Sequence, residues 1–187
     1  MSYMADSLTK PAIPATDAFA LVRRVVLRFG GGVGALCSLW IVGLHLTGNN
    51  AFGPKQLLAE LLVPFVALAS QWTLRRQLLP VKPGLARAMA VGGLTTLLAA
   101  GLCACAVWGL GHVVGEPTLA QHRAEITEIM QTQQQVDRKD RKLVPLTAAQ
   151  RAAISGITVN DLAVSNFKAV LLLGLVFSLP GGIFFRE

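Results

Sequence analysis

The stretch AMAVGGLTTLLAAGLCACAVWGLGHVV, residues Ala88–Val114, contains no charged side chain. A helix rises about 1.5 Å per residue, so about 20 residues cross a hydrocarbon core of about 30 Å. Three further runs have a similar character, and only the second of them holds an acid, Glu60: they are Phe29–Gly48, Leu57–Leu74 and Ala169–Phe185. Because backbone polar groups find no water inside a bilayer, such runs must form helices. The sequence therefore predicts an all-α membrane protein with four transmembrane helices.

Composition agrees with a membrane location. Hydrophobic residues make up 53% of the chain and charged residues 14%, against about 25% charged in a typical soluble protein. A net charge of +7 would favour nucleic-acid binding in a soluble chain. Aromatic and basic residues are not interleaved here, so base stacking is not expected and we predict no nucleic-acid partner. The three cysteines all lie within apolar runs and predict no disulfide framework.

Basic residues predict the orientation of the spans. The connection between the second and third spans carries Arg75, Arg76, Lys82 and Arg87 and no acid. Because cytoplasmic segments near span ends are rich in Lys and Arg, we expect this connection and both termini in the cytoplasm. The chain then divides into a cytoplasmic tail (residues 1–24), three spans (25–114), an extramembrane helical segment (115–166), and a fourth span with the C-terminus (167–187).

Small residues predict which helix faces meet. Lipid tails are as apolar as leucine, so transmembrane helices associate through close contact at small residues. A GxxxG pair, Gly30 and Gly34, opens the first span. The third span carries two adjacent rows at four-residue spacing, one with Gly92, Thr96, Ala100 and Ala104 and the other with Gly101, Cys105 and Gly109. We expect both rows to lie at helix contacts.

Two prolines fall within the spans. Pro64 removes one helical hydrogen bond, so we expect a kink in the second helix. The sequence Pro180-Gly181-Gly182 is expected to break the fourth helix near its end. Breaks of this kind mark ion sites in some transporters, but no matching broken helix is visible elsewhere in the sequence. Ordinary kinking is therefore the preferred interpretation.

The polar segment after the third span predicts two helices. Pro117 suits a first helical turn, and an apolar side follows with Leu119, Ile126, Ile129 and Met130. His122 is expected to face solvent. Thr147 with Gln150 three residues later is a capping-box pattern that begins a second helix. Gly156 is expected to end it before the chain re-enters the membrane near Phe167.

The order of these features resembles the bacterial membrane family called domain of unknown function 4199. The similarity lies in the basic Arg-Arg connection, the small-residue-rich third span, the Glu116-Pro117 exit, the charged external helix and the Leu146–Gln150 helix start. It covers most of residues 23–187. The resemblance implies four helices and a bacterial inner membrane, and it brings no functional residue with it.

Three ionisable residues are candidates for chemistry. Glu60 lies about one turn inside the outer end of its span, where an acid either carries protons or cations or reaches interfacial water. His45 and His112 lie at similar depth on other helices, so the three could form a His/His/Glu cation site if they converge. Interfacial histidines without a metal are the commoner case. No metal or other cofactor is predicted.

The function predicted from the sequence is therefore that of a non-enzymatic accessory or interaction subunit. Its expected partners are the lipid bilayer and another membrane protein or a second copy of the chain. The alternative is a small oligomeric transporter or channel for a proton, cation or small solute, with Glu60 and the histidines on the path. Four short spans rarely enclose a solute pathway alone, so that alternative requires self-association.

Overall fold

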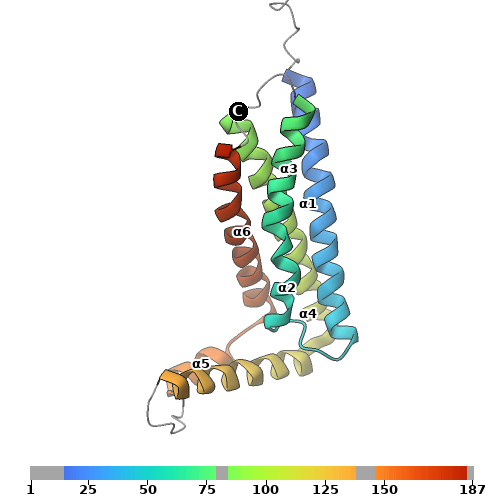
Figure 1. Ribbon diagram of the computed structural model, residues 1–187. Coiled ribbons are helices and arrows are strands. Elements are labelled where there is room, and N and C mark those ends of the chain that lie inside the picture. The colour runs from blue at the N-terminus through green and yellow to red at the C-terminus, as the bar shows by residue number, and fades with distance from the viewer. Residues whose placement is uncertain (1–14, 79–83, 138–145, 185–187) are drawn as a thin grey trace, which may run out of the picture.

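The computed structural model describes residues 15–78, 84–137 and 146–184, and these contain helices and no strand. Four long helices stand side by side as a bundle (Figure 1). They are α1 (Ala15–Leu46), α3 (Leu62–Leu78), the first part of α4 (Leu85–Asp137) and α6 (Val159–Phe184). The short elements are η1 (Pro54–Gln56), α2 (Leu57–Glu60) and α5 (Ala148–Ser155).

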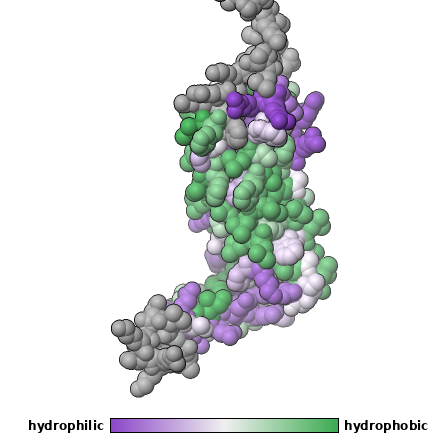
Figure 2. Space-filling view, viewed as in Figure 1, coloured by the Kyte–Doolittle hydropathy of each residue, from purple (hydrophilic) through white to green (hydrophobic). Residues whose placement is uncertain are grey.

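All four helical segments predicted to cross the membrane are present. Each is long and apolar enough to span a bilayer: Phe19–Leu46, Pro54–Leu78, a helix within Leu85–Gln133, and Val159–Phe184. Apolar side chains cover the visible face of the bundle, and polar residues gather at its two ends (Figure 2). The chain is therefore a multi-pass membrane protein.

Small buried residues bring the helices together. A Cβ at Gly30 would lie 2.8 Å from the Thr95 carbonyl oxygen, and one at Gly34 would lie 2.7 Å from Leu102. At Gly92 the same atom would lie 2.3 Å from the Gln71 amide, and Ala100 is fully buried. Neighbouring helices approach closely at these positions, as the first row of small residues and the GxxxG pair predicted.

The second row is not a contact surface, which corrects the prediction. Apart from the adjacent backbone of α4 itself, no atom lies within 4 Å of a Cβ built at Gly101 or Gly109, and Cys105 is exposed. Gly101 instead lines a hollow of about 480 Å³ between α1 and α4, with apolar walls. Successive helical residues point about 100° apart, so two adjacent rows cannot both face α6. The row through Gly92 and Ala100 packs against α6.

The two prolines behave differently. The second span is interrupted at Leu61, between α2 and α3, close to the point where Pro64 removes a hydrogen bond to residue 60. In contrast, α6 continues through Pro180 to Phe184, so the predicted break is absent. The two glycines that follow Pro180 are packed: a Cβ at Gly181 would lie 2.3 Å from Leu68, and one at Gly182 would lie 2.6 Å from Met89.

A glycine turns α4 out of the bundle. Gly115 has φ +68° and ψ −164°, a conformation that only glycine adopts readily. Residues 116–137, which we call the arm, then lie across the end of the bundle beside α5 (Figure 1). The capping box at Thr147 and Gln150 and the end of α5 at Gly156 are as predicted.

The fourth long helix starts earlier than expected. It begins at Val159, well before the predicted boundary at residue 167. Thr158 and Asp161 explain this start, since the Thr158 backbone N–H donates to the Asp161 carboxylate at 2.9 Å and the Asp161 N–H donates to the Thr158 hydroxyl at 3.3 Å. This second capping box fixes the first turn of α6 next to the arm.

Candidate functional site at the junction of the bundle and the arm

Asn50 connects the first loop to the arm. Its amide Nδ2 donates to the Glu125 carboxylate and lies 3.2 Å from His122 Nδ1. Its Oδ1 accepts a 3.0 Å hydrogen bond from the Phe52 backbone N–H. The Phe52 and His122 rings meet edge to face with centroids 6.1 Å apart. We call Asn50, Phe52, His122 and Glu125 the Asn50 cluster, and it holds the arm against the bundle.

Local turns place Asn50 inside this cluster. Gly48 has φ +75°, and the Gly48 and Asn49 N–H groups donate to the His45 and Leu44 carbonyls, which ends α1 in a tight turn. His122 lies on the apolar side of the arm, one turn after Leu119, and both side chains are buried. The prediction that His122 faces solvent is therefore wrong, because this side of the arm covers the bundle end.

Arg123 ties the arm to the segment before α6. Its Nη1 forms an ion pair with Glu116, and its Nη2 donates to the Ile157 carbonyl oxygen at 2.7 Å. The arm is therefore joined to the first loop through Asn50 and to the start of α6 through Arg123. These two links fix the direction in which α4 continues after Gly115.

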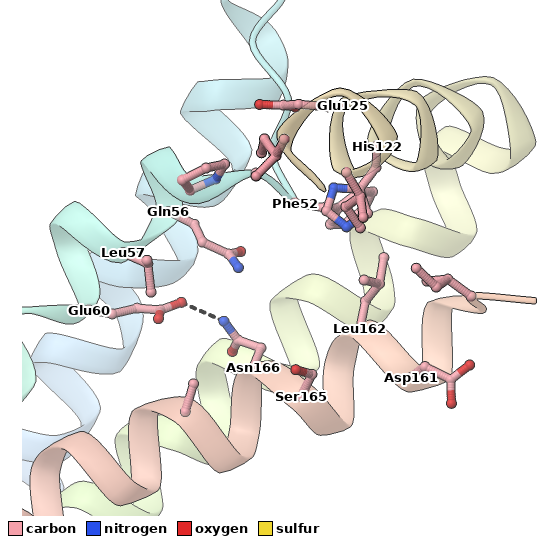
Figure 3. Close-up of a pocket in the computed structure, with 16 residues that line it drawn as sticks. Phe52, Gln56, Leu57, Glu60, His122, Glu125, Asp161, Leu162, Ser165 and Asn166 are labelled. Atoms are coloured by element: carbon pink, nitrogen blue, oxygen red, sulfur yellow. Dashed lines mark hydrogen bonds between the residues drawn. The ribbon is translucent and has the colours of Figure 1, made fainter. Parts of the chain in front are cut away.

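A cavity of about 550 Å³ lies beneath the arm. We call it the junction cavity, and Figure 3 shows its lining. Its walls come from the first loop and α2, from the inner side of the arm, and from the first turns of α6. The lining residues are Phe52, Gly53, Pro54, Gln56, Leu57, Glu60, His122, Glu125, Ile126, Ile129, Ile157, Asp161, Leu162, Ser165, Asn166 and Ala169.

Glu60 points into the protein at the inner end of this cavity. Its side chain is 1% exposed and accepts a hydrogen bond from the Asn166 amide, which is 4% exposed (Figure 3). Of the two alternatives given for Glu60, a side chain that reaches interfacial water is therefore excluded by its burial. The turn of α2 directs its carboxylate toward α6, where Asn166 supplies a donor. The position of Glu60 in the sequence indicates a depth within the span but not the direction of its side chain.

Two amide oxygens beside Glu60 have no partner. The buried Oε1 of Gln56 and Oδ1 of Asn166 accept no hydrogen bond in the described structure. Figure 3 shows the Gln56 amide directed toward the Glu60–Asn166 pair. Leaving a buried polar atom unpaired costs about 1–3 kcal/mol. The inner end of the junction cavity is therefore rich in hydrogen-bond acceptors that lack donors.

The histidine and glutamate candidates do not converge. Among the described residues, no three His, Cys, Asp or Glu side chains lie together as a possible metal site. His112 is exposed, and its Nδ1 lies 2.8 Å from the Trp108 carbonyl oxygen. Its ring lies tilted against the Trp108 ring, with centroids 4.2 Å apart. His45 is half-buried in the last turn of α1. The possible His/His/Glu cation site is thus not formed.

Sequence reasoning missed Asn50, His122, Glu125 and Asn166. One signal was available on the arm, since His122 and Glu125 follow Leu119 and precede Ile126 and Ile129 on a shared helix side. Polar residues that interrupt an apolar side often have buried partners. No comparable signal marks Asn50 or Asn166, because Asn50 only follows Asn49 in a short polar turn and Asn166 only follows Ser165, and neither pair repeats with a helical period.

Acidification is expected to loosen the arm. Burial lowers the pKa of His122 below its ordinary value of 6.5, and the neighbouring Glu125 opposes this shift only in part. An undocked arm therefore binds a proton more readily than the docked arm, so docking weakens as the pH falls below about 6.5. Besides Glu125, the groups that face this imidazole are the uncharged Asn50 and Phe52.

Hydrogen–deuterium exchange of the arm amides at pH 7.5 and 5.5 measures this effect. We expect faster exchange at the lower pH, after correction for the intrinsic rate. His122→Gln should reduce the difference, whereas His112→Gln, at an exposed position outside the Asn50 cluster, should leave it intact. Equal pH responses in the two variants would show that another group controls the arm.

Comparisons of the chain with protein-family models, curated proteins and solved structures found no match.

Proposed function

We propose that this four-span protein is a non-enzymatic accessory subunit of the bacterial inner membrane that receives a binding partner in the junction cavity. The observation that carries the proposal is the open cavity with a buried carboxylate and two unpartnered amide oxygens at its inner end. Pockets of 300–1,000 Å³ with apolar walls and a few polar groups are typical of binding sites. An occupant that donates hydrogen bonds would remove the cost of the unpaired oxygens.

The proposed orientation puts the arm and the junction cavity outside the cytoplasm. Arg23, Arg24 and Arg28 of α1 lie at the bundle end opposite the arm, together with Arg75 and Arg76 of α3. The positive-inside rule favours the cytoplasm for that end. Both termini would then be cytoplasmic, and the cavity would open near the outer surface of the membrane.

Tight packing favours binding over transport through a single copy. Directly beyond Glu60, the centre of the bundle is filled by fully buried Cys37, Val63, Ala99 and Val170. The Cys37 thiol lies 3.5 Å from the Ala59 carbonyl oxygen in this layer. A solute that reached Glu60 would meet close-packed side chains, so a transport path would have to run between copies.

We also propose membership of the family called domain of unknown function 4199. The four-span layout and the capped helix start at Thr147 support it. The family has no assigned chemistry, so this membership would add a membrane context and no reaction.

A protected cysteine tests the proposed function. Ser165 lines the junction cavity and is exposed, so we expect Ser165→Cys, in a Cys105→Ala background, to react quickly with a membrane-impermeant maleimide in the purified protein. In native membranes a bound partner should slow this reaction several-fold. Ala124→Cys, on the exposed side of the arm, is the matched control and should react equally in both. Equal slowing at both positions, or none at Ser165→Cys, would contradict the proposal.

A further inference from the structure

We propose that the junction cavity binds a primary ammonium group attached to an apolar body, with the ammonium held by Glu60, Asn166 and Gln56. This inference rests on the proposed binding function and names the chemistry of the occupant. It is carried by the arrangement at the inner end of the cavity, where the buried Glu60 carboxylate meets Asn166 and the Gln56 amide is directed toward this pair (Figure 3). One oxygen of each of the two amides has no hydrogen-bond partner.

The polar groups at the inner end of the cavity determine which charge and how many hydrogen-bond donors the bound molecule should have. A primary ammonium has three N–H donors and no acceptor. Glu60, Gln56 and Asn166 provide acceptor oxygens, and the Glu60 carboxylate supplies the opposite charge. An anion would be repelled by the Glu60 carboxylate. An alcohol has one donor and would leave two of these oxygens unpaired, and a quaternary ammonium has none.

The remaining lining agrees with an organic cation. Among the residues that line the cavity there is no Lys or Arg, while Asp161 and Glu125 add carboxylates nearer the arm. The walls between them are apolar, with Phe52, Leu57 and Leu162 labelled in Figure 3. A bare divalent metal ion fits less well, because Ca²⁺ takes 6–8 oxygen ligands and only one carboxylate is buried here. An alkyl or aryl group next to the ammonium would cover the apolar walls.

Two sources share this chemistry. One is a phospholipid with an ethanolamine headgroup, because the cavity lies at the end of the bundle where headgroups are found. The other is a soluble amine with a short apolar chain. The proposal concerns the ammonium site, and the experiment separates the two sources.

Calorimetry with three six-carbon probes tests the proposal. The full chain is placed in nanodiscs of phosphatidylcholine and phosphatidylglycerol, which carry no primary amine, and is titrated with hexylamine, hexanol or hexyltrimethylammonium. Charged hydrogen bonds favour hexylamine, and we expect it to bind at least about tenfold more tightly than the other two. Equal affinity for hexylamine and hexanol would overturn the proposal, since the carboxylate and the free oxygens would then contribute nothing.

Variants locate the site. Glu60→Gln and Gln56→Met should each weaken hexylamine binding, by about tenfold or more for the loss of the charge. Glu128→Gln, which removes an exposed carboxylate of the arm that does not line the cavity, should change it by less than about threefold. Glu60→Gln alters a buried group and could misfold. In that case Gln56→Met still tests the site. Unchanged binding in folded Gln56→Met and Glu60→Gln proteins would place the amine elsewhere.

Ethanolamine phospholipid in the nanodiscs distinguishes the sources. Weaker apparent hexylamine binding in such discs supports a lipid headgroup as the occupant, and unchanged binding supports a soluble amine. Failure of hexylamine to bind, with Ser165→Cys still protected in native membranes, would remove the ammonium assignment and keep the binding function. Hexylamine binding without that protection would instead support the site and remove the accessory role.

Discussion

Gly174→Ala is expected to destabilise the bundle, whereas Gly101→Ala should leave its stability unchanged or raise it slightly. A Cβ at Gly174 would lie 2.2 Å from Thr96 Cγ2 and 2.6 Å from its Oγ1. Thr96 cannot turn away without cost, because its hydroxyl donates to the Gly92 carbonyl oxygen at 3.0 Å in a fully buried position. Overpacking of this kind typically costs about 1–3 kcal/mol, and α4 and α6 must move apart.

Gly101 is a matched control on α4, the helix against which Gly174 packs. No atom lies within 4 Å of a Cβ at this position, so alanine adds only its better helix propensity, up to about 1 kcal/mol. The readout is the midpoint of thermal unfolding in one detergent, followed by tryptophan fluorescence. Opposite shifts are expected for the two variants. If Gly101→Ala lowered the unfolding midpoint as much as Gly174→Ala does, the hollow between α1 and α4 would be a helix contact.

Gly115→Ala is expected to release the arm from the bundle. The glycine has φ +68° and ψ −164°, a region that L-residues with a Cβ avoid at a cost of about 1–3 kcal/mol. An alanine there favours ordinary helical angles, which would continue α4 straight out of the bundle. Asn50 and His122 would then separate, and the junction cavity would lose the wall formed by the arm.

Spin labels at Leu46→Cys and Ala124→Cys, in a Cys105→Ala background, measure this release. Both positions are exposed, one at the end of α1 and one on the arm. We expect a narrow distance distribution in the parent and a broad, longer one with Gly115→Ala. Gly109→Ala is the control, because it lies in the helical part of α4 with nothing within 4 Å. A narrow distribution retained by Gly115→Ala would mean that Asn50 and Arg123 alone determine the direction of the arm.

The spans could be predicted from sequence because, inside a bilayer, the backbone polar groups of each span must form hydrogen bonds within that span. A run such as Ala88–Val114 has no alternative to a helix, whatever its neighbours are. The row through Gly92 and Ala100 was also recognisable, but the adjacent row through Gly101 has the same spacing and composition. Spacing identifies a possible contact face, and only the positions of the other helices decide which face is used.

The junction could not be predicted because its contacts join distant parts of the chain. Asn50 lies in a short loop and meets His122 only because Gly115 turns the arm back over that loop. Similarly, the direction of Glu60 depends on α6, which begins at Val159 rather than near residue 167. An asparagine that follows one other polar residue, as in Asn49-Asn50 and Ser165-Asn166, gives no periodic signal. Capping boxes are local, so the one at Thr147 was recognised.

The partnership of Glu60 and Asn166 has a consequence for biosynthesis. The two residues are 106 positions apart in sequence, which corresponds to about 5–20 s of translation at 5–20 residues per second. The second span therefore leaves the ribosome with its acid long before the matching amide exists. A shallow position lets that carboxylate remain hydrated at the membrane surface during the delay. The depth of Glu60 thus suits the nascent chain, and its burial is completed only when α6 is inserted.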